Sequence, residues 1–173
     1  MIDPVRAVVG AWEQGRSTVA YLVSDGRLEQ VAAKGASDAA GRLLERAERR
    51  LTTASAGLGG GDVEGAFVAA YDAYRMAAES LLLRQGLRAT GGEGSHVAVE
   101  DAVSAQFASA ITAFAKPTFE AFRRMRHSAQ YFDPDGPTIT YDDAAWAIST
   151  ARSAAAGARR VGESGGLPRF ELS

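Results

Sequence analysis

The chain has 173 residues, of which 46% are hydrophobic, and its formal net charge is −2. This length suits one domain with a real core, and the hydrophobic content excludes a wholly disordered chain. There is no cysteine, so disulfides and thiolate metal sites are excluded, which fits a reducing cytosol. No uncharged apolar run approaches the roughly 20 residues of a membrane span, and the first residues lack the build of a signal peptide. With a slightly negative net charge, any anion binding must come from a local patch.

Residues 4–24 are predicted to form one or two short helices, followed by a loop within the first 36 residues. Gly15 is expected to interrupt the first helical segment. The helical spacing of that segment is carried by Val5, Val8, Val9 and Trp12. Residues 19–23 are ambiguous between helix and strand, because a short apolar run has no distinctive period. If these residues and residues 28–31 were strands, the turn signal between them would join a hairpin; we favour a helix followed by a loop.

The next segment carries the pattern of two long helices. Ser37 or Asp38 is expected to cap the first helix, and the glycine-rich residues 57–61 are expected to end it. Asp62 is expected to cap the second, which has the strongest amphipathic pattern in the chain and which we interpret as the central helix. Its apolar positions recur at intervals of three and four, at Phe67, Ala70, Tyr71, Tyr74, Ala77, Ala78, Leu81 and Leu82. Gly86 follows the predicted end of this central helix, where a glycine in the left-handed conformation commonly caps a helix.

Polar residues accompany this central helix. Asp72 and Arg75 lie off its apolar stripe, one turn apart, and can pair. Residues 87–96 are rich in glycine and predict a loop between helices. Their spacing is not that of a phosphate-binding loop, and they do not follow a strand. Ser95 is expected to cap a helix over residues 97–114.

The most distinctive stretch is basic, with three arginines and a histidine within five residues. These residues are Arg123, Arg124, Arg126 and His127. Four apolar residues of the same stretch, Phe119, Phe122, Met125 and Ala129, fall on one helical stripe, so one face anchors the helix. Pro117 is expected at its start, and residues 133–137 are expected to stop it. Arginines near a helix end often only stabilise the helix, so a structural role stays open beside anion binding.

A last helix is predicted to begin with a capping box of Thr140 and Asp143. Together the elements predict an all-α fold, an antiparallel four- to five-helix bundle with a short N-terminal extension. We divide the chain into this extension (residues 1–36), the bundle (residues 37–161) and a loose C-terminal tail (residues 162–173).

Several of these segments together resemble a HEPN-domain protein, and they are most similar to the small stand-alone bacterial members. The resemblance covers residues 37–161. It rests on residues 70–82 and 85–88, on the glycine loop with His96, and above all on residues 122–131 of the basic helix.

The signature of the HEPN family lies in this basic helix. It consists of an arginine, then Asn, Asp or His, then three residues, then a histidine. Arg126 and His127 match the first two positions, whereas Tyr131 stands where the histidine belongs. In ribonuclease members the signature forms the RNA-cleaving site at a dimer cleft. For this chain the resemblance therefore implies Arg126, His127 and Tyr131 as the catalytic candidates of a metal-independent endoribonuclease.

The exchange of histidine for tyrosine matters for the chemistry. RNA cleavage without a metal uses the 2′-hydroxyl as nucleophile and needs a proton acceptor, a proton donor and a cation near the phosphate. Arginine supplies the cation and forks onto phosphate. Histidine carries protons near neutral pH, whereas tyrosine, with a pKa of about 10, is a poor base. We expect His127 to point to a different side of the helix from Tyr131, and therefore weak catalysis or none.

Three functions fit this pattern. The first is a homodimer with an arginine-lined cleft for RNA, a nucleotide or an acidic partner; the ligand-binding candidates are Arg123, Arg124, Arg126 and His96. The second is a ribonuclease toxin of a toxin–antitoxin or defence system, for which the resemblance implies a minimal nucleotidyltransferase as antitoxin. The third is a helical oligomerisation scaffold whose arginines pair with its own acids. In each case we expect a cytoplasmic bacterial protein without cofactor, metal or membrane. The resemblance also implies Tyr131 as a candidate for modification.

Overall fold

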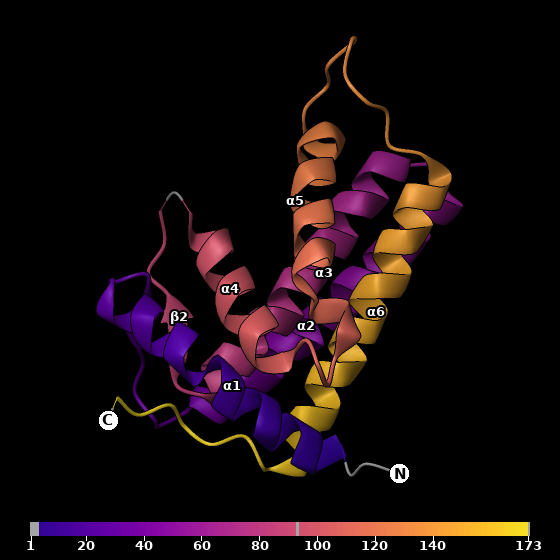
Figure 1. Cartoon of the computed structure of the whole chain (residues 1–173). Coiled ribbons are helices and arrows are strands. Elements are labelled where there is room, and N and C mark those ends of the chain that lie inside the picture. Colours follow the sequence, from indigo (N-terminus) through magenta and orange to yellow (C-terminus); the bar gives the residue numbers. More distant parts are fainter. Residues whose placement is uncertain (1–3, 93, 173) are drawn as a thin grey trace.

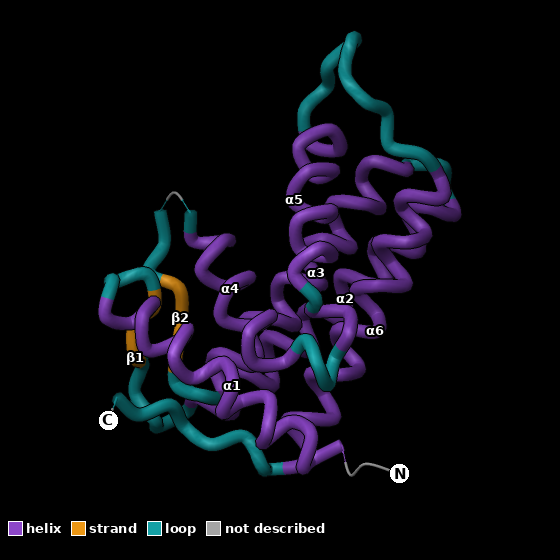
Figure 2. The backbone as a smooth tube through the Cα atoms, in the orientation of Figure 1, coloured by secondary structure: helices purple, strands orange, loops and turns teal. Residues whose placement is uncertain are grey.

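The computed structural model describes residues 4–92 and 94–172, with side chains from residue 13 onward. Within these ranges the chain forms six α-helices, one short 3-10 helix and a two-stranded sheet (Figures 1 and 2). The long helices α2 (Ala36–Gly59), α3 (Val63–Arg84) and α6 (Tyr141–Ser164) pack against one another as the body of the bundle (Figure 1). The predicted all-α helical bundle is confirmed.

Helix α3 is the centre of this bundle. It packs against α2 and α6, and also against α4 (Ser95–Phe107) and α5 (Lys116–Gln130). Of its 22 residues 13 are buried, so several of its faces are covered, and its predicted central place is confirmed. The Asp62 carboxylate caps the helix as predicted, accepting a hydrogen bond from the Gly65 backbone at 2.9 Å. No helix in the described part of the chain combines the length and the apolar character needed to cross a membrane.

A single helix spans residues 4–24, which the sequence predicts as one or two short helices. Helix α1 (Pro4–Ser24) continues through Gly15 and packs against α4. A Cβ atom at Gly15 would lie 2.8 Å from backbone carbons of Ala105 and Gln106 in α4. Gly15 therefore allows two helices to approach closely, and the prediction that it interrupts the helix was wrong. The side chains of the predicted apolar face lie outside the described residues; they are Val5, Val8, Val9 and Trp12.

The segment after α1 pairs with a distant part of the chain. Strand β1 (Leu28–Gln30) runs antiparallel to β2 (Leu87–Ala89), which follows α3. The hairpin considered within the first 36 residues does not form, because residues 19–23 belong to α1. The glycine-rich segment that was predicted as a loop begins as a strand. Strands of three residues are too short to show a period in the sequence.

Two helices begin earlier than predicted. Helix α2 begins at Ala36, so Ser37 and Asp38 lie in its first turn instead of capping it. Helix α4 begins at Ser95 and ends at Phe107, whereas its end was predicted near residue 114. In both helices the residue before the first turn is a glycine in the left-handed conformation, with no side-chain cap. Glycine adopts this conformation without strain, so these starts lack the usual cap signature.

The C-terminal residues pack onto the bundle. Thr140 and Asp143 form the predicted capping box at the start of α6. After α6 ends, the chain returns to the bundle, where Phe170 is buried and its backbone N–H donates to the Gln85 carbonyl at 2.8 Å. Residues 162–164 of the predicted tail belong to α6, and Phe170 is packed against the bundle where a loose tail was expected. The division of the chain at residues 36 and 161 stays a prediction.

Candidate functional site

Helix α5 carries the basic stretch and is anchored by one face. Phe119 and Phe122 are buried, and the ring of Phe122 stacks on that of Tyr74 with the centroids 4.4 Å apart. Met125 and Ala129, further along the stripe, are partly buried against the core. The predicted apolar stripe therefore faces the bundle, and the arginines emerge beside it.

Arg126 turns back onto the bundle. Its guanidinium carbon lies 4.9 Å from the centroid of the Tyr71 ring on α3, which is the geometry of a cation–π interaction. Its Nε atom is buried without a hydrogen-bond acceptor. No carboxylate of the described residues forms an ion pair with it. Arg126 is therefore held by an aromatic face, and no carboxylate within the described residues neutralises its charge.

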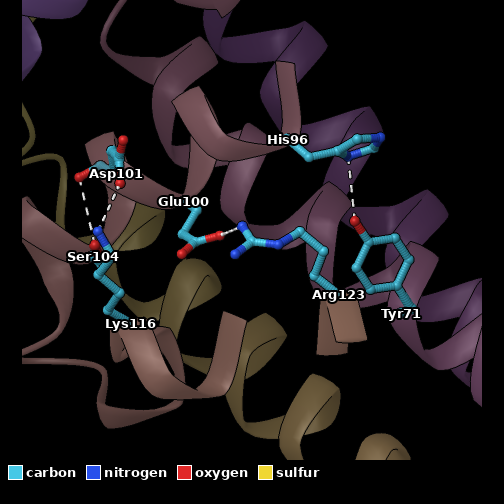
Figure 3. A network of polar contacts seen from close by, with 7 residues as sticks. All are labelled: Tyr71, His96, Glu100, Asp101, Ser104, Lys116 and Arg123. Atoms are coloured by element: carbon cyan, nitrogen blue, oxygen red, sulfur yellow. Dashed lines mark hydrogen bonds and ion pairs between the residues drawn. The ribbon is translucent and has the colours of Figure 1, made fainter. Parts of the chain in front are cut away.

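Tyr71 also contacts His96, which lies in the first turn of α4. The Tyr71 hydroxyl oxygen is 3.2 Å from Nδ1 of His96, and the two groups are hydrogen-bonded (Figure 3). Burial is the largest cause of a lowered pKa at His96, and the guanidinium groups of Arg75, Arg126 and Arg123 lower it further. The surroundings therefore favour a neutral imidazole.

Two of these neighbouring cations are paired with carboxylates. Arg123 forms an ion pair with Glu100 of α4 (Figure 3), and Arg75 pairs with Glu79 at 3.2 Å. The Glu100 side chain is 3% exposed, and burial raises its pKa while Arg123 opposes this rise. Asp72, whose spacing would allow a pair with Arg75, has no ion pair within the described residues, because Arg75 pairs with Glu79 instead.

We call five residues the arginine cluster; they are Tyr71, Arg75, His96, Arg123 and Arg126. The cluster contains three of the four predicted ligand-binding residues. The fourth, Arg124, is exposed and forms no ion pair with the described residues. No group of three or more histidine, aspartate or glutamate side chains in the described part of the chain is placed to hold a metal ion.

Two members of the cluster were not predicted from the sequence. Tyr71 was interpreted only as part of the apolar stripe of α3, where its ring does lie, and its hydroxyl carries no sequence signal. Arg75 was interpreted as a surface residue. Its position four residues after Tyr71, on the same face of one helix, was the available hint. Both residues gain their role from the approach of α4 and α5 to α3.

His127 and Tyr131 lie apart from the arginine cluster. Both are exposed, and their ring centroids are 5.2 Å apart. The expectation that they point to different sides of the helix was wrong, because four steps of about 100° make one full turn plus about 40°. No side-chain hydrogen bond and no ring contact among the described residues joins their side chains to the arginine cluster. The structure therefore separates Arg126 from the two other residues of the signature.

We expect the protein to lose stability in acid through His96. Because folding lowers the pKa of His96, the unfolded chain binds this proton more readily. The contribution of His96 to stability is therefore complete above its ordinary pKa of 6.5 and is lost as the pH falls through the lowered value. Urea unfolding at a series of pH values should show this fall, and His96→Gln should remove it.

The control for this prediction is His127→Gln, since the sequence has only two histidines. This variant should keep the acid dependence that His96 causes. The same acid dependence in His96→Gln and in the wild type would contradict the prediction. Glu79 and Glu100 have pKa values raised by burial and change stability in the opposite direction, so the comparison between variants is the decisive measurement.

The fold and the site define a helical-bundle domain that presents an arginine-rich surface beside a partly buried histidine. The sequence model of the HEPN domain family matches residues 40–156, which is more than half of the chain. The protein therefore belongs to the HEPN family. The match runs from α2 into α6 and includes the arginine cluster, whereas α1 lies outside it. No curated protein and no solved structure matches the chain.

Proposed function

We propose that the protein binds the phosphate groups of RNA or of a nucleotide through the arginine cluster and Arg124, with little or no catalysis. The observation that carries the proposal is the state of Arg126, whose guanidinium lies on Tyr71 without a carboxylate partner among the described residues. A guanidinium held in place and not neutralised is ready to fork onto phosphate oxygens. The cytoplasm, where RNA and nucleotides are abundant, is the proposed location.

We further propose that the protein acts as a homodimer formed through α5 and its neighbours. HEPN domains commonly dimerise. The connection between α5 and α6 projects beyond the bundle (Figure 1), and it exposes aromatic side chains, with Phe132 94% exposed and Tyr131 58% exposed. Tyr141, at the start of α6, is also exposed and lines a hollow together with Leu58 and Ile148. Exposed aromatic side chains grouped in this way are typical of protein interfaces.

Weak or absent catalysis is proposed from the exchange at Tyr131. The tyrosine stands where ribonuclease members have the proton-carrying histidine, and it lies on the exposed side of α5. A phenol donates a hydrogen bond but accepts a proton poorly at neutral pH. The site therefore has the cations for phosphate and lacks the usual base.

A ribonuclease toxin is the second candidate, and the contact between His127 and Tyr131 favours it. This contact places one imidazole beside the position of the missing histidine. In this case a minimal nucleotidyltransferase is the proposed antitoxin. Expression should then arrest growth, and Arg126→Ala should abolish the arrest. Harmless overexpression with intact cellular RNA would count against a toxin.

A helical scaffold is the third candidate, and the ion pair of Arg123 with Glu100 favours it for that one arginine. The stability of a variant that lacks the Arg126 guanidinium distinguishes the scaffold from the binding function. A structural arginine stabilises the fold, so its loss lowers the free energy of unfolding, whereas a ligand-facing arginine can be removed at little cost.

We expect Arg126→Gln to weaken binding of single-stranded RNA by about 10- to 100-fold, because a charge-assisted hydrogen bond contributes about 1.5–3 kcal/mol. The slope of log affinity against log salt should fall by about one for each phosphate that the variant no longer neutralises. Fluorescence anisotropy with labelled RNA at several salt concentrations measures both, and light scattering gives the oligomeric state of the same samples.

The matched control is Arg42→Gln, which removes an exposed arginine of α2 outside the arginine cluster. Its affinity for RNA should stay within about twofold of the wild type. Absence of salt-sensitive binding to RNA or to nucleotides by the wild type would end the binding proposal, and a monomeric protein would end the homodimer. If Arg126→Gln lowers stability but not affinity, the scaffold is the better account.

A further inference from the structure

We propose that a phosphate oxygen of the ligand binds inside the arginine cluster, between Arg126 and the Tyr71–His96 pair, and that His96 takes up a proton from solvent when it binds. The proposal rests on the proposed binding of RNA or a nucleotide. It adds the position of one phosphate and a coupling of binding to pH, and it places this contact within one protomer.

The cluster contains hydrogen-bond donors that have no acceptor. Among the described residues, three arginine Nε atoms are buried without a partner, and two of them belong to Arg75 and Arg126. Arg75 keeps Glu79 as a partner for its terminal nitrogen, whereas Arg126 has no carboxylate within the described chain. The buried Nε of Arg126 is closed to a ligand, but its terminal nitrogens are not among these buried atoms, and the side chain is partly exposed. A phosphate oxygen beside them would supply an acceptor and a negative charge together. The cluster is therefore short of one anion.

The hydrogen bond between Tyr71 and His96 gives this phosphate a contact that depends on a proton. Burial raises the pKa of Tyr71, so its hydroxyl keeps its hydrogen. In the proposed unliganded state this hydroxyl donates to Nδ1 of a neutral His96. Once His96 is protonated, Nδ1 becomes a donor and the direction of the hydrogen bond reverses. The hydroxyl hydrogen of Tyr71 can then turn to a phosphate oxygen.

The second nitrogen of the imidazole offers a further contact. Figure 3 shows this nitrogen turned away from Tyr71, and the His96 side chain is only partly buried. In the protonated ring both nitrogens are donors. The imidazolium can therefore donate to Tyr71 on one side and to an anion on the other, without breaking the contact that the structure shows at 3.2 Å.

The charges around His96 set the direction of the coupling. Five titratable or charged groups act on it from two neighbouring helices: Tyr71, Asp72 and Arg75 on α3, and Arg123 and Arg126 on α5. Behind them, Glu79 pairs with Arg75 and Glu100 pairs with Arg123. Without ligand, the three arginines oppose a positive charge on His96 and Asp72 favours it. A phosphate among these cations adds a negative charge and so favours the imidazolium. Because linkage is reciprocal, the phosphate should bind more tightly to the protonated protein.

The test is an NMR titration of the imidazole signals in the full-length protein. The sequence has two histidines, so the spectrum of His127→Gln assigns both signals. The main probe is a short oligouridylate with hydroxyl ends, whose phosphodiesters do not titrate near neutral pH. Uridine monophosphate tests a free nucleotide as the source of the phosphate, and a polyglutamate peptide tests an acidic protein.

We expect the oligouridylate to raise the pKa of His96 by about one unit, which corresponds to about tenfold tighter binding to the protonated state. Affinity should accordingly fall by about three- to tenfold between about pH 5.5 and about pH 8. His96→Gln should lose this dependence, Arg126→Gln should lose the rise in pKa, and Tyr71→Phe should reduce it. Glu79 and Glu100 remain in all three variants and serve as the common background.

The outcomes separate this inference from the proposed function. If the oligouridylate binds and Arg126→Gln weakens it, but the pKa of His96 stays constant and His96→Gln keeps the pH dependence, the inference fails and the proposed function stands. If only uridine monophosphate raises the pKa, the phosphate site stands and RNA binding fails. An equal response to polyglutamate would overturn the assignment to phosphate. Binding of none of the probes would overturn both proposals.

Discussion

Replacing Phe122 by alanine should lower the free energy of unfolding by about 3–5 kcal/mol. Phe122 is fully buried, and its ring lies 4.4 Å from that of Tyr74 on α3 and 4.8 Å from that of Trp146 on α6, measured between centroids. It therefore joins α5 to two helices of the bundle. Removing the ring leaves a cavity that the neighbouring rings fill only in part. The arginines of α5 should lose their placement as well, so RNA affinity should fall even where the variant is folded.

Urea unfolding of matched variants measures this effect. Phe132→Ala removes the same ring from a position that is 94% exposed, and it should change the free energy of unfolding by less than about 0.5 kcal/mol. Phe122→Leu keeps most of the volume and should lose less than Phe122→Ala. A loss below about 1 kcal/mol for Phe122→Ala would mean that this residue does not anchor α5.

Gly15→Ala should destabilise the protein by about 1–3 kcal/mol, although alanine is the better helix former. The added Cβ would lie 2.8 Å from backbone carbons of Ala105 and Gln106, so α1 and α4 must move apart. Since α4 carries His96 and Glu100, this shift should also disturb the hydrogen bond of His96 to Tyr71. The effect would show that a helix outside the residues matched by the family positions part of the proposed site.

Gly41→Ala is the matched control for this substitution. Gly41 lies inside α2, and a Cβ added there would meet no atom within 4 Å. This variant should gain about 0.5–1 kcal/mol, because alanine has the higher helix propensity. Gly15→Ala should therefore lower the temperature of thermal unfolding and shift the NMR signal of His96. Gly41→Ala should raise the unfolding temperature and leave that signal unchanged. A stabilised Gly15→Ala would contradict the close packing of α1 on α4.

Much of the helical architecture was predictable because its signals are local. The repeat of apolar residues at intervals of three and four identified α3 and α5, and Asp62, Thr140 and Asp143 marked helix starts with side-chain caps. The failures lay where the signal was weak or non-local. Helices that begin after a left-handed glycine carry no cap residue, and strands β1 and β2 are three residues long and far apart in the chain.

The site divides in the same way. Arg126 was singled out from the sequence because it matches the family signature and lies in the most basic stretch of the chain. Its placement over Tyr71, the hydrogen bond of Tyr71 to His96 and the choice of Glu100 as partner of Arg123 were not predictable. These contacts join three helices whose residues are separated by 23 or more positions in the chain.

The sequence alone was thus sufficient to predict the helical fold class, the family and the position of the basic helix. Each of these depends on the spacing of residues within single segments. Which arginine is neutralised and which histidine stands beside the remaining cation depended on how α3, α4 and α5 cross. Those crossings are set by non-local packing, by the close approach at Gly15 and by the rings around Phe122, and no local pattern encodes them.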